Sequence, residues 1–238
     1  MLLKLIYIIF PRLYTKLYFI YKNKSDNKKI KLIKNNIKNK DVIIDIGANI
    51  GFYTVLFSKL LRNSTIYGFE PSKENFSLLK KNVGKYSPKN NKNIIKILNK
   101  AVGEKTRKIK LYKSPIINVD HQTYNSGENR QFELVKCVKL DNFFSKGTKI
   151  DFIKIDIQGY DYYAIQGCKR IIKDNPNIKI IGELWPYGLS KSGSSVDKYL
   201  QFFKNLGFTV IIEDIKFNLN NKHCYEKKYY TDFFAFQK

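Results

Sequence analysis

The chain has 238 residues, of which 43% are hydrophobic, so it can form one α/β domain with terminal additions rather than two independent domains. Its three cysteines, Cys137, Cys168 and Cys224, form no Cys-x-x-Cys pair, which argues against a disulfide framework or zinc knuckle and favours a reducing compartment such as the cytosol. The formal net charge is +24, but only five of the 44 basic residues are arginine. Because bidentate phosphate recognition favours arginine, the charge alone is weak support for specific nucleic-acid binding.

Residues 2–21 form an apolar N-terminal segment that Pro11, Arg12 and Lys16 interrupt. No window reaches the ~20 uncharged residues that a spanning helix needs, and no small-residue cleavage site follows. Two interpretations stay open: a helix that packs on the domain, or an interfacial anchor whose neighbouring lysines face lipid phosphates. Those lysines are Lys22, Lys24, Lys28 and Lys29. Residues 22–29 are predicted to be a linker, so we expect an extension over 1–29 and a domain over 30–238.

From residue 30 onward, short runs of β-branched residues alternate with amphipathic segments. The pattern predicts strands over 41–46, 65–70, 94–98, 149–156, 178–184, 208–213 and 233–236. It predicts helices over 51–61, 72–86, 160–172 and 196–206. Alternation of this kind is typical of a parallel sheet covered on both faces. Residues 106–140 break the rhythm and are predicted to be a β-rich insertion with a polar loop.

The most informative motif is Asp45-Ile46-Gly47-Ala48-Asn49-Ile50-Gly51, which follows the first strand. Ligands of open α/β sheets bind beyond the carboxyl ends of the strands, where glycines let the backbone turn tightly. Only Gly47 and Gly51 are present, so the G-x-G-x-x-G pattern of a dinucleotide site is incomplete. The carboxylate of Asp45 instead suits a cationic ligand that carries an ammonium and a sulfonium.

A second acid, Glu70, ends the next strand in Phe69-Glu70-Pro71. An acid at this position can accept hydrogen bonds from both hydroxyls of a ribose. The alternative is a surface acid that stabilises the start of the following helix.

The third motif is Lys154-Ile155-Asp156-Ile157-Gln158-Gly159-Tyr160. Strand alternation places Lys154 and Asp156 on one side, and a buried strand rarely carries charge without a reason. A Lys–Asp pair that only orients the backbone is the alternative. Glu183, at the end of the next strand, points toward the same rim and can place substrate or pair with a lysine. No spacing of His, Asp and Glu predicts a metal site, although Asp156 with Glu183 could hold one divalent ion.

These residues resemble those of the FkbM-type methyltransferases over about residues 40–238. The matching stretches are VIIDIGANIGFYT, IYGFEPSKENFSLLKKNV, NKAVGE, KLDNFF and IDFIKIDIQGYDYYAIQGCKRII, with GEL soon after. The resemblance implies S-adenosylmethionine as the cofactor and oxygen methylation, commonly of a sugar hydroxyl. It also implies a class I methyltransferase fold: an α/β, seven-stranded, doubly wound sheet whose last strand is antiparallel.

Site residues follow from the resemblance position by position. It implies cofactor contacts for Asp45, Gly47, Asn49, Gly51 and Glu70, an adenine-side segment at Asn99 and Ala101, and an acid beside the methyl group at Asp156. One departure is Gln158, where many members carry Glu before the glycine of the fourth-strand motif. The substitution removes a charge near the site, and it suggests a non-catalytic cofactor-binding scaffold as one alternative function.

The polar loop of the insertion contains Asp120-His121-Gln122-Thr123-Tyr124, which is similar to a family loop with an Asp-His pair. Histidine is the side chain best suited to move a proton near neutral pH. We therefore expect His121 to act as the base, with Asp156 positioning the acceptor and Lys154 stabilising developing oxyanion charge. A loop histidine held by hydrogen bonds is the alternative.

The sequence thus predicts an S-adenosylmethionine-dependent O-methyltransferase that acts on a sugar of a glycan or glycoconjugate. Loop 114–130 is expected to cover the substrate, with Tyr124, Arg130 and Glu183 as candidate substrate residues. An RNA ribose (cap-type) 2'-O-methyltransferase is the nearest alternative, because Lys154, Asp156 and Glu183 resemble part of a ribose-activating set. The expected location is cytoplasmic, with peripheral membrane contact through residues 2–21 as an open option.

Overall fold

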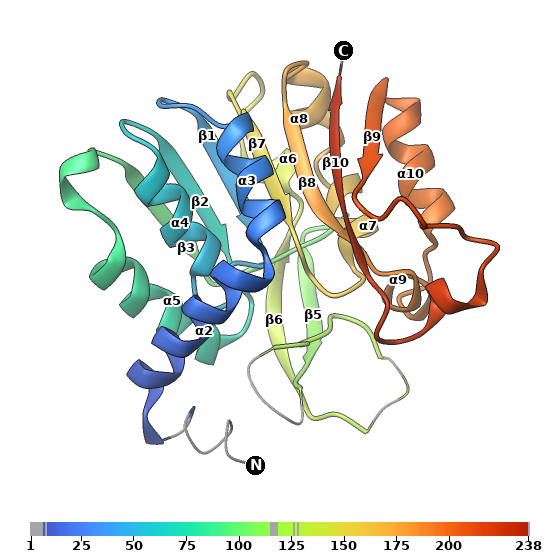
Figure 1. Ribbon diagram of the computed structural model, residues 1–238, viewed down its shortest axis with the longest axis horizontal. Helices are drawn as coiled ribbons and strands as arrows, with labels where there is room; N and C mark the ends of the chain where they lie inside the picture. Colours follow the sequence, from blue (N-terminus) through green and yellow to red (C-terminus); the bar gives the residue numbers. More distant parts are fainter. Residues whose placement is uncertain (1–6, 8, 115–118, 126, 128, 238) are drawn as a thin grey trace.

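The computed structural model describes residues 7, 9–114, 119–125, 127 and 129–237. Residues 2–6 and 8 of the N-terminal segment, and residues 115–118, 126 and 128 of the substrate loop, lie outside the described residues. Within the described part, two layers of helices enclose a central sheet (Figure 1).

The central sheet has seven strands in the order β3-β2-β1-β7-β8-β10-β9. The strands are β1 (Val42–Ile46), β2 (Thr65–Phe69), β3 (Ile94–Leu98), β7 (Phe152–Ile155), β8 (Lys179–Leu184), β9 (Phe208–Ile212) and β10 (Thr231–Gln237). All neighbours from β3 to β8 are parallel, and β10 is antiparallel to both β8 and β9. The predicted seven-stranded α/β sheet with an antiparallel last strand is confirmed.

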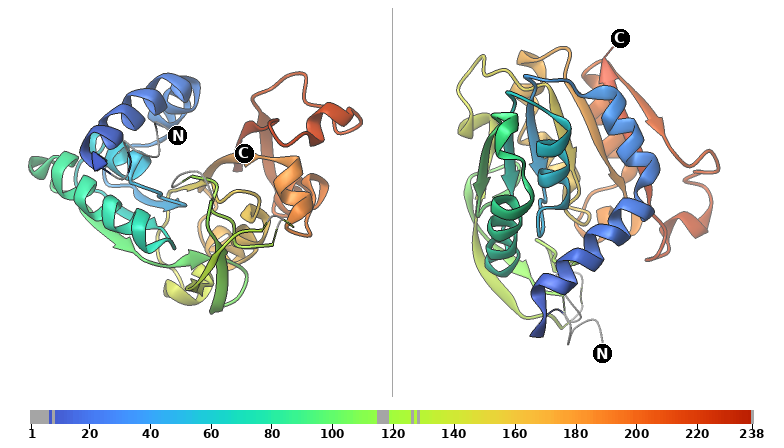
Figure 2. Two further views of the ribbon diagram at one scale, coloured as in Figure 1. Left: turned by 90° about the horizontal axis from the view of Figure 1, so that it is seen from below. Right: turned by 60° about the vertical axis from the view of Figure 1, so that its left-hand side comes forward.

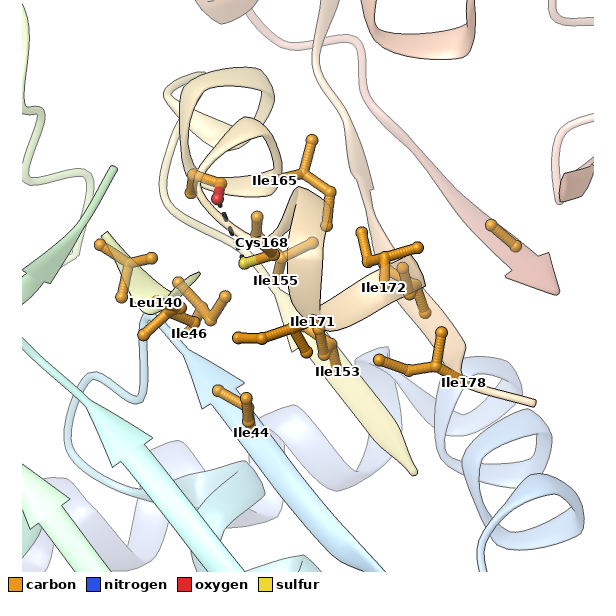
Figure 3. Close-up of a cluster of buried hydrophobic side chains, with 14 of the residues drawn as sticks. Ile44, Ile46, Leu140, Ile153, Ile155, Ile165, Cys168, Ile171, Ile172 and Ile178 are labelled. Carbon is orange, nitrogen blue, oxygen red and sulfur yellow. Dashed lines mark hydrogen bonds between the residues drawn. The ribbon is translucent and has the colours of Figure 1, made fainter. Parts of the chain in front are cut away.

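The two faces of the sheet carry separate apolar clusters because successive strand residues point to opposite sides. Ile43 of β1 packs with α3 (Asn27–Asn36) and α4 (Phe52–Leu60) on one face. Ile44 and Ile46 pack on the other face with α7 (Asp161–Gln166), α8 (Lys169–Asp174) and α10 (Val196–Asn205). Figure 3 shows Ile165, Cys168, Ile171 and Ile172 of that second face against β1 and β7. The sheet is therefore buried on both sides, as its continuous apolar strands require.

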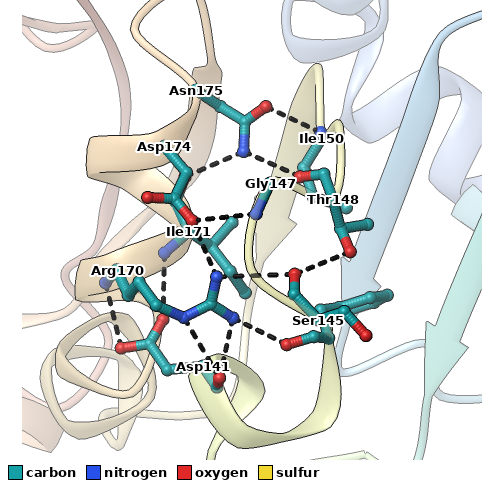
Figure 4. A network of polar contacts seen from close by, with 10 residues as sticks. Asp141, Ser145, Gly147, Thr148, Ile150, Arg170, Ile171, Asp174 and Asn175 are labelled. Atoms are coloured by element: carbon teal, nitrogen blue, oxygen red, sulfur yellow. Dashed lines mark hydrogen bonds and ion pairs between the residues drawn. The ribbon is translucent and has the colours of Figure 1, made fainter.

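The helix predicted over 160–172 is two helices, α7 and α8, separated at Gly167 and Cys168. The carboxylate of Asp141, in α6 (Leu140–Phe143), accepts the backbone N–H groups of Arg170 at 2.9 Å and Ile171 at 3.0 Å. The guanidinium of Arg170 in turn donates to the carbonyls of Asp141 and Phe144, both at 2.7 Å (Figure 4). This network satisfies the first N–H groups of α8, so a second helix can begin there.

The N-terminal segment differs from the linker expected over 22–29. Helix α2 (Pro11–Ser25) and helix α3 leave only Asp26 between them, and Lys29 is buried with its Nζ 2.5 Å from Asp232 Oδ1 of β10. Ile30 and Ile33 of α3 are core residues. The lysine-rich composition suggested a linker, but the aliphatic parts of these side chains and their acidic partners allow helical packing.

The insertion forms a second, three-stranded sheet in the order β4-β6-β5, with β4 (Ala101–Val102), β5 (Arg107–Tyr112) and β6 (Phe132–Val138). In Figure 1 this sheet and the start of α2 lie below the central sheet, at the edge where its parallel strands end. The remaining helices are α5 (Lys73–Tyr86), α9 (Pro186–Lys191), η1 (Lys89–Asn91) and η2 (Lys222–Tyr225). Figure 2 shows α2 and α5 on one side of the molecule, away from α10. No described helix is long and apolar enough to cross a membrane.

Candidate active site

A cavity of about 530 Å³ lies at the carboxyl ends of β1, β2, β7 and β8. Its wall includes Gly47, Asn49, Glu70, Ala101 and Asp156 from the sequence-predicted site. Volumes of this size are typical of sites for cofactors and small molecules. The residues at the strand ends therefore lie together, as predicted, but some line the cavity and others support its wall from behind.

The turn after β1 approaches the end of β7 closely. Gly47 has φ +81°, and a Cβ at this position would lie 2.0 Å from the carbonyl oxygen of Asp156. Asn49 has φ +50°, and its backbone N–H donates to Glu70 Oε2 at 2.9 Å. Only glycine fits the first position, so the turn brings its backbone to the cavity wall without a side chain in between.

Glu70 is buried, and each of its carboxylate oxygens accepts a backbone N–H. Ser72 donates to Oε1 and Asn49 to Oε2, both at 2.9 Å. Burial raises the pKa of Glu70 to about 7, against the lowering effect of these two bonds. The side chain of Asn75 is a third hydrogen-bond partner of this carboxyl. A carboxylate has about four acceptor sites, so Glu70 keeps acceptor capacity for a ribose hydroxyl at the cavity wall.

Asn99 and Ala101 have different places around the predicted adenine side. Ala101 lines the cavity, together with Pro71 and Val102. Asn99 is not among the lining residues, and its Nδ2 donates to the carbonyls of Glu70 at 3.0 Å and Pro71 at 2.8 Å. Asn99 therefore holds the Glu70 turn in place instead of forming the wall.

Asp45 lies behind the cavity wall rather than on it. Its side chain is fully buried, Oδ2 accepts a 2.7 Å hydrogen bond from Thr54 Oγ1, and Oδ1 lies 3.3 Å from Lys154 Nζ. It is not among the residues that line the cavity. The expectation that this carboxylate contacts a cationic ligand directly is therefore corrected, because a buried lysine already neutralises it.

Lys154 connects three parts of the site. Its Nζ donates to the carbonyl of Gly47 at 3.1 Å, lies 3.3 Å from Asp45 and 4.0 Å from Asp156 Oδ2. The side chain is 3% exposed and also borders the cavity. The ammonium group therefore compensates both carboxylates and fixes the glycine turn, which agrees with the orienting alternative.

Asp156 and Glu183 are two carboxyl groups on the same wall with opposite pKa shifts. Burial raises the pKa of Asp156, but Lys154, Lys29 and Lys22 outweigh it and leave the pKa lowered. Burial and the nearby Asp156 raise the pKa of Glu183 well above its usual range. Pairs whose environments separate their pKa values in this way are typical of sites that transfer protons.

Gln158 contacts the key carboxylate directly. Its Nε2 donates to Asp156 Oδ1 at 3.0 Å, and the residue has φ +57°. The hydrogen bond favours the ionised form of Asp156. A glutamine at this position is thus compatible with a charged Asp156, whereas a glutamate would place a like charge beside it.

His121 lines the cavity, but its hydrogen bonding opposes the expected role as base. The backbone N–H of Ser114 donates to His121 Nδ1 at 2.9 Å, which places the proton of the neutral ring on Nε2. Burial lowers the pKa of His121 to about 4. Nε2 is buried and has no hydrogen-bond partner in the described part of the chain. The proton of the neutral ring is therefore on Nε2, which opposes the predicted role of His121 as the base.

Tyr124 and Arg130 fasten the loop instead of lining the cavity. The hydroxyl of Tyr124 donates to the carbonyl of Gln158 at 2.8 Å. Arg130 donates to Asp120 Oδ2 at 2.7 Å and to the Asp120 carbonyl at 2.6 Å, and its side chain is 2% exposed. Asp120, which has φ +60°, is thus paired with Arg130 and not with His121. These contacts hold the described part of the loop beside the cavity.

Sequence reasoning missed a whole wall of the cavity. Helix α2 contributes Tyr18, Tyr21 and Lys22, and the segment before β10 contributes Lys227, Lys228 and Tyr230. Trp185 completes this wall, and its Nε1 donates to the carbonyl of Lys227 at 2.9 Å. The tyrosines of α2 recur at helical spacing, which was a usable signal once the segment was assigned to a helix. Among the described residues, no group of three or more His, Cys, Asp or Glu side chains is placed to hold a metal ion.

Comparisons with known proteins agree with this geometry. A family model described as the methyltransferase FkbM domain matches residues 45–210. The chain is similar to the solved structure of a methyltransferase FkbM from Methylobacillus flagellatus KT, with a TM-score of 0.56, 16% identity, and coverage of 84% of this chain and 44% of that chain. The chain therefore spans less than half the length of that protein.

Two further solved structures share the fold. An rRNA methylase from Streptococcus thermophilus has a TM-score of 0.53 and 8% identity, with 88% of this chain and 94% of that chain covered. A Streptococcus mutans protein in complex with S-adenosylhomocysteine (SAH) has a TM-score of 0.52 and 12% identity, with 88% and 95% covered. No curated protein matches the chain by sequence.

Proposed function

Because this chain belongs to the FkbM methyltransferase family, we propose that it methylates a hydroxyl oxygen of a saccharide. It has the class I methyltransferase fold and is an S-adenosylmethionine-dependent methyltransferase. When bound, S-adenosylmethionine supplies a methyl group on a sulfonium, and the lining residues Gly47, Asn49, Glu70 and Ala101 would hold its amino-acid and nucleoside parts. The acceptor class is the part that we propose.

The composition of the remaining cavity wall carries this proposal. Its wall combines the aromatic side chains of Tyr18, Tyr21, Trp185 and Tyr230 with the carboxyl groups of Asp156 and Glu183. Aromatic rings cover the apolar face of a sugar ring, and carboxyl groups bond to its hydroxyls. The ionised Asp156 disfavours a phosphate close to the reacting position, because like charges repel in a buried site.

Within this proposal, Asp156 accepts the hydroxyl proton. Its carboxylate lies on the cavity wall, has a lowered pKa, and is oriented by Gln158. S-adenosylmethionine, when bound, would supply the methyl group that the acceptor oxygen takes, and the hydroxyl proton would pass to the Asp156 carboxylate. Lys154 and the Gly47 turn keep the geometry of this part of the site. Positioning by such groups is a major source of rate enhancement.

One observation favours RNA ribose as a second candidate acceptor. The sequence motifs supply only one lysine, Lys154, for a ribose-activating set. In the structure, two lysines of the N-terminal helices, Lys22 and Lys29, lie close enough to Asp156 to lower its pKa. Lys22 also lines the cavity, as do Lys227 and Lys228. A Lys–Asp–Lys–Glu arrangement with Lys154 and Glu183 is therefore possible in the folded chain.

The deciding experiment uses methyl-labelled S-adenosylmethionine with a panel of saccharides and capped RNAs at physiological salt. We expect label on a saccharide hydroxyl, with Asp156→Asn reducing turnover about 10²–10⁴-fold while SAH still binds. His121→Ala serves as the control and should reduce turnover far less. Label on capped RNA, with none on any saccharide, would reverse the order of the two candidates.

A further inference from the structure

Helix α2 has an exposed apolar face that the rest of the described chain does not cover. Six large apolar side chains between Ile9 and Tyr21 are at least 44% exposed. They are Ile9, Phe10, Leu13, Leu17, Ile20 and Tyr21. From Phe10 onward they recur at intervals of three and four residues, which places them along one side of the helix. The opposite side packs on the domain through Tyr14 and Thr15, which are 3% and 2% exposed.

The surroundings of this face are basic. The first 25 residues contain five basic residues and no Asp or Glu. Beside α2, a hollow of about 450 Å³ against α5 is lined by Arg12, Lys81 and Lys85, together with the small or polar residues Thr15, Asn82 and Gly84. The three basic side chains lie on exposed residues. Thr15 places this hollow on the domain-facing side of α2, whereas Arg12 at its rim is exposed. An apolar face with exposed cations beside it is complementary to a bilayer surface with anionic headgroups.

The dimensions favour a helix that lies in the interface. Helix α2 has 15 residues, short of the ~20 that a spanning helix needs. Its exposed Arg12 and Lys16 adjoin apolar-face residues in the sequence, as in helices that insert one side to the level of the headgroups. Tyr21 belongs both to this face, at 64% exposure, and to the cavity wall. The membrane-facing side is thus continuous with the mouth of the active site.

We propose that α2 docks this enzyme on an anionic membrane surface, with the apolar face in the headgroup region and the exposed side chains of Arg12, Lys81 and Lys85 contributing attraction to lipid phosphates. Docking in this orientation turns the acceptor side of the cavity toward the bilayer. The proposal does not depend on which hydroxyl is methylated, since binding is measured without an acceptor.

Co-sedimentation of the full chain with vesicles tests the docking. We expect binding to vesicles of phosphatidylcholine with phosphatidylglycerol, weaker binding to phosphatidylcholine alone, and partial release by high salt. Leu13→Gln with Leu17→Gln should lower the partition coefficient about tenfold or more, since buried apolar area drives insertion. Ile94→Gln, which replaces an apolar side chain of similar exposure (56%) on β3, is the matched control and should leave binding unchanged.

A charge-matched pair tests the basic hollow. Arg12→Glu with Lys85→Glu should lower binding to anionic vesicles, because each cation near such a surface contributes about fivefold to partitioning. Lys169→Glu with Lys173→Glu changes the net charge equally, but on exposed positions of α8 at a distance from α2 (Figure 1).

SAH affinity is the folding check for every variant. Equal vesicle binding by Leu13→Gln/Leu17→Gln and the unaltered chain overturns the proposal. Loss of a dimer in that variant, with no lipid binding by the unaltered chain, assigns the face to a second copy instead.

Discussion

The ammonium group of Lys154 lies 3.3 Å from the carboxylate of Asp45, and neither side chain is more than 3% exposed. The same Nζ donates to the carbonyl of Gly47 in the turn that lines the cavity. A buried charge pair thus supports the cofactor side of the site from behind. The first and third sequence motifs are joined by this contact, although 109 positions separate the two residues.

Lys154→Met should destabilise the fold strongly, since it leaves the Asp45 carboxylate buried and uncompensated. Breaking such a pair costs about 3–5 kcal/mol, measurable as a lower urea midpoint. Lys149→Met removes an exposed partner of Asp151 and should cost less than about 1 kcal/mol. Adding Asp45→Asn to Lys154→Met should restore part of the loss. Equal stability of the Lys154→Met and Lys149→Met variants would contradict the proposed support.

Glu70→Ala should weaken SAH binding by about 1.5–3 kcal/mol, because a charged acceptor for the ribose hydroxyls is lost. Isothermal titration calorimetry measures the change. Glu74→Ala, on the exposed first turn of α5, is the control and should bind normally. An unchanged affinity in Glu70→Ala would remove this residue from the cofactor site.

The affinity for SAH should also rise with pH through the titration of Glu70. Burial raises the pKa of Glu70 to about 7, so the carboxyl is largely protonated at pH 6 and ionised at pH 8. The ionised form accepts hydrogen bonds more strongly, which predicts tighter binding at pH 8. Glu70→Gln should abolish this pH dependence. A pH dependence that persists unchanged in Glu70→Gln would assign it to the ligand or to another residue.

Gln158→Glu should move the acidic limb of the turnover profile to higher pH. In the unaltered chain the Gln158 amide donates to Asp156, whose lowered pKa keeps it ionised, and activity is lost only as the pH falls through that pKa. A second carboxylate in contact raises the pKa of the pair, by about one unit or more. Gln166→Glu on α7, whose amide donates to Tyr162, is the control. If the pH profiles of turnover coincide for both variants and the unaltered chain, Gln158 does not influence the proton transfer.

Gly47→Ala should abolish SAH binding and lower the melting temperature. The added Cβ would lie 2.0 Å from the backbone oxygen of Asp156, in a conformation with φ +81° that side chains disfavour. Gly84→Ala is the matched control, since no atom lies within 4 Å of its added Cβ and the position is inside α5. That variant should gain about 0.5–1 kcal/mol from helix propensity. Normal SAH binding by Gly47→Ala would show that the turn can move.

The sequence alone was sufficient for the sheet and for most of the strand-end residues. Apolar β-strands that alternate with amphipathic helices permit few architectures, and parallel strands bring their carboxyl ends to one edge. The sequence therefore predicts Gly47, Glu70 and Asp156 at one site, because strand order and alternation determine where such residues lie. The last strand's antiparallel position came from the family resemblance and is confirmed.

Tertiary structure alone decided which of these groups meets the ligand and which supports it. Asp45 has a lysine partner and Asn99 holds a turn, both through contacts between residues distant in the sequence, and Arg130 pairs with Asp120 across one loop. The state of His121 depends on one backbone N–H and on burial, neither of which a motif encodes. Helix α2 also lines the cavity, which the sequence did not predict. The composition of a segment gives its charge, but its acidic and aromatic partners elsewhere in the fold determine where it packs.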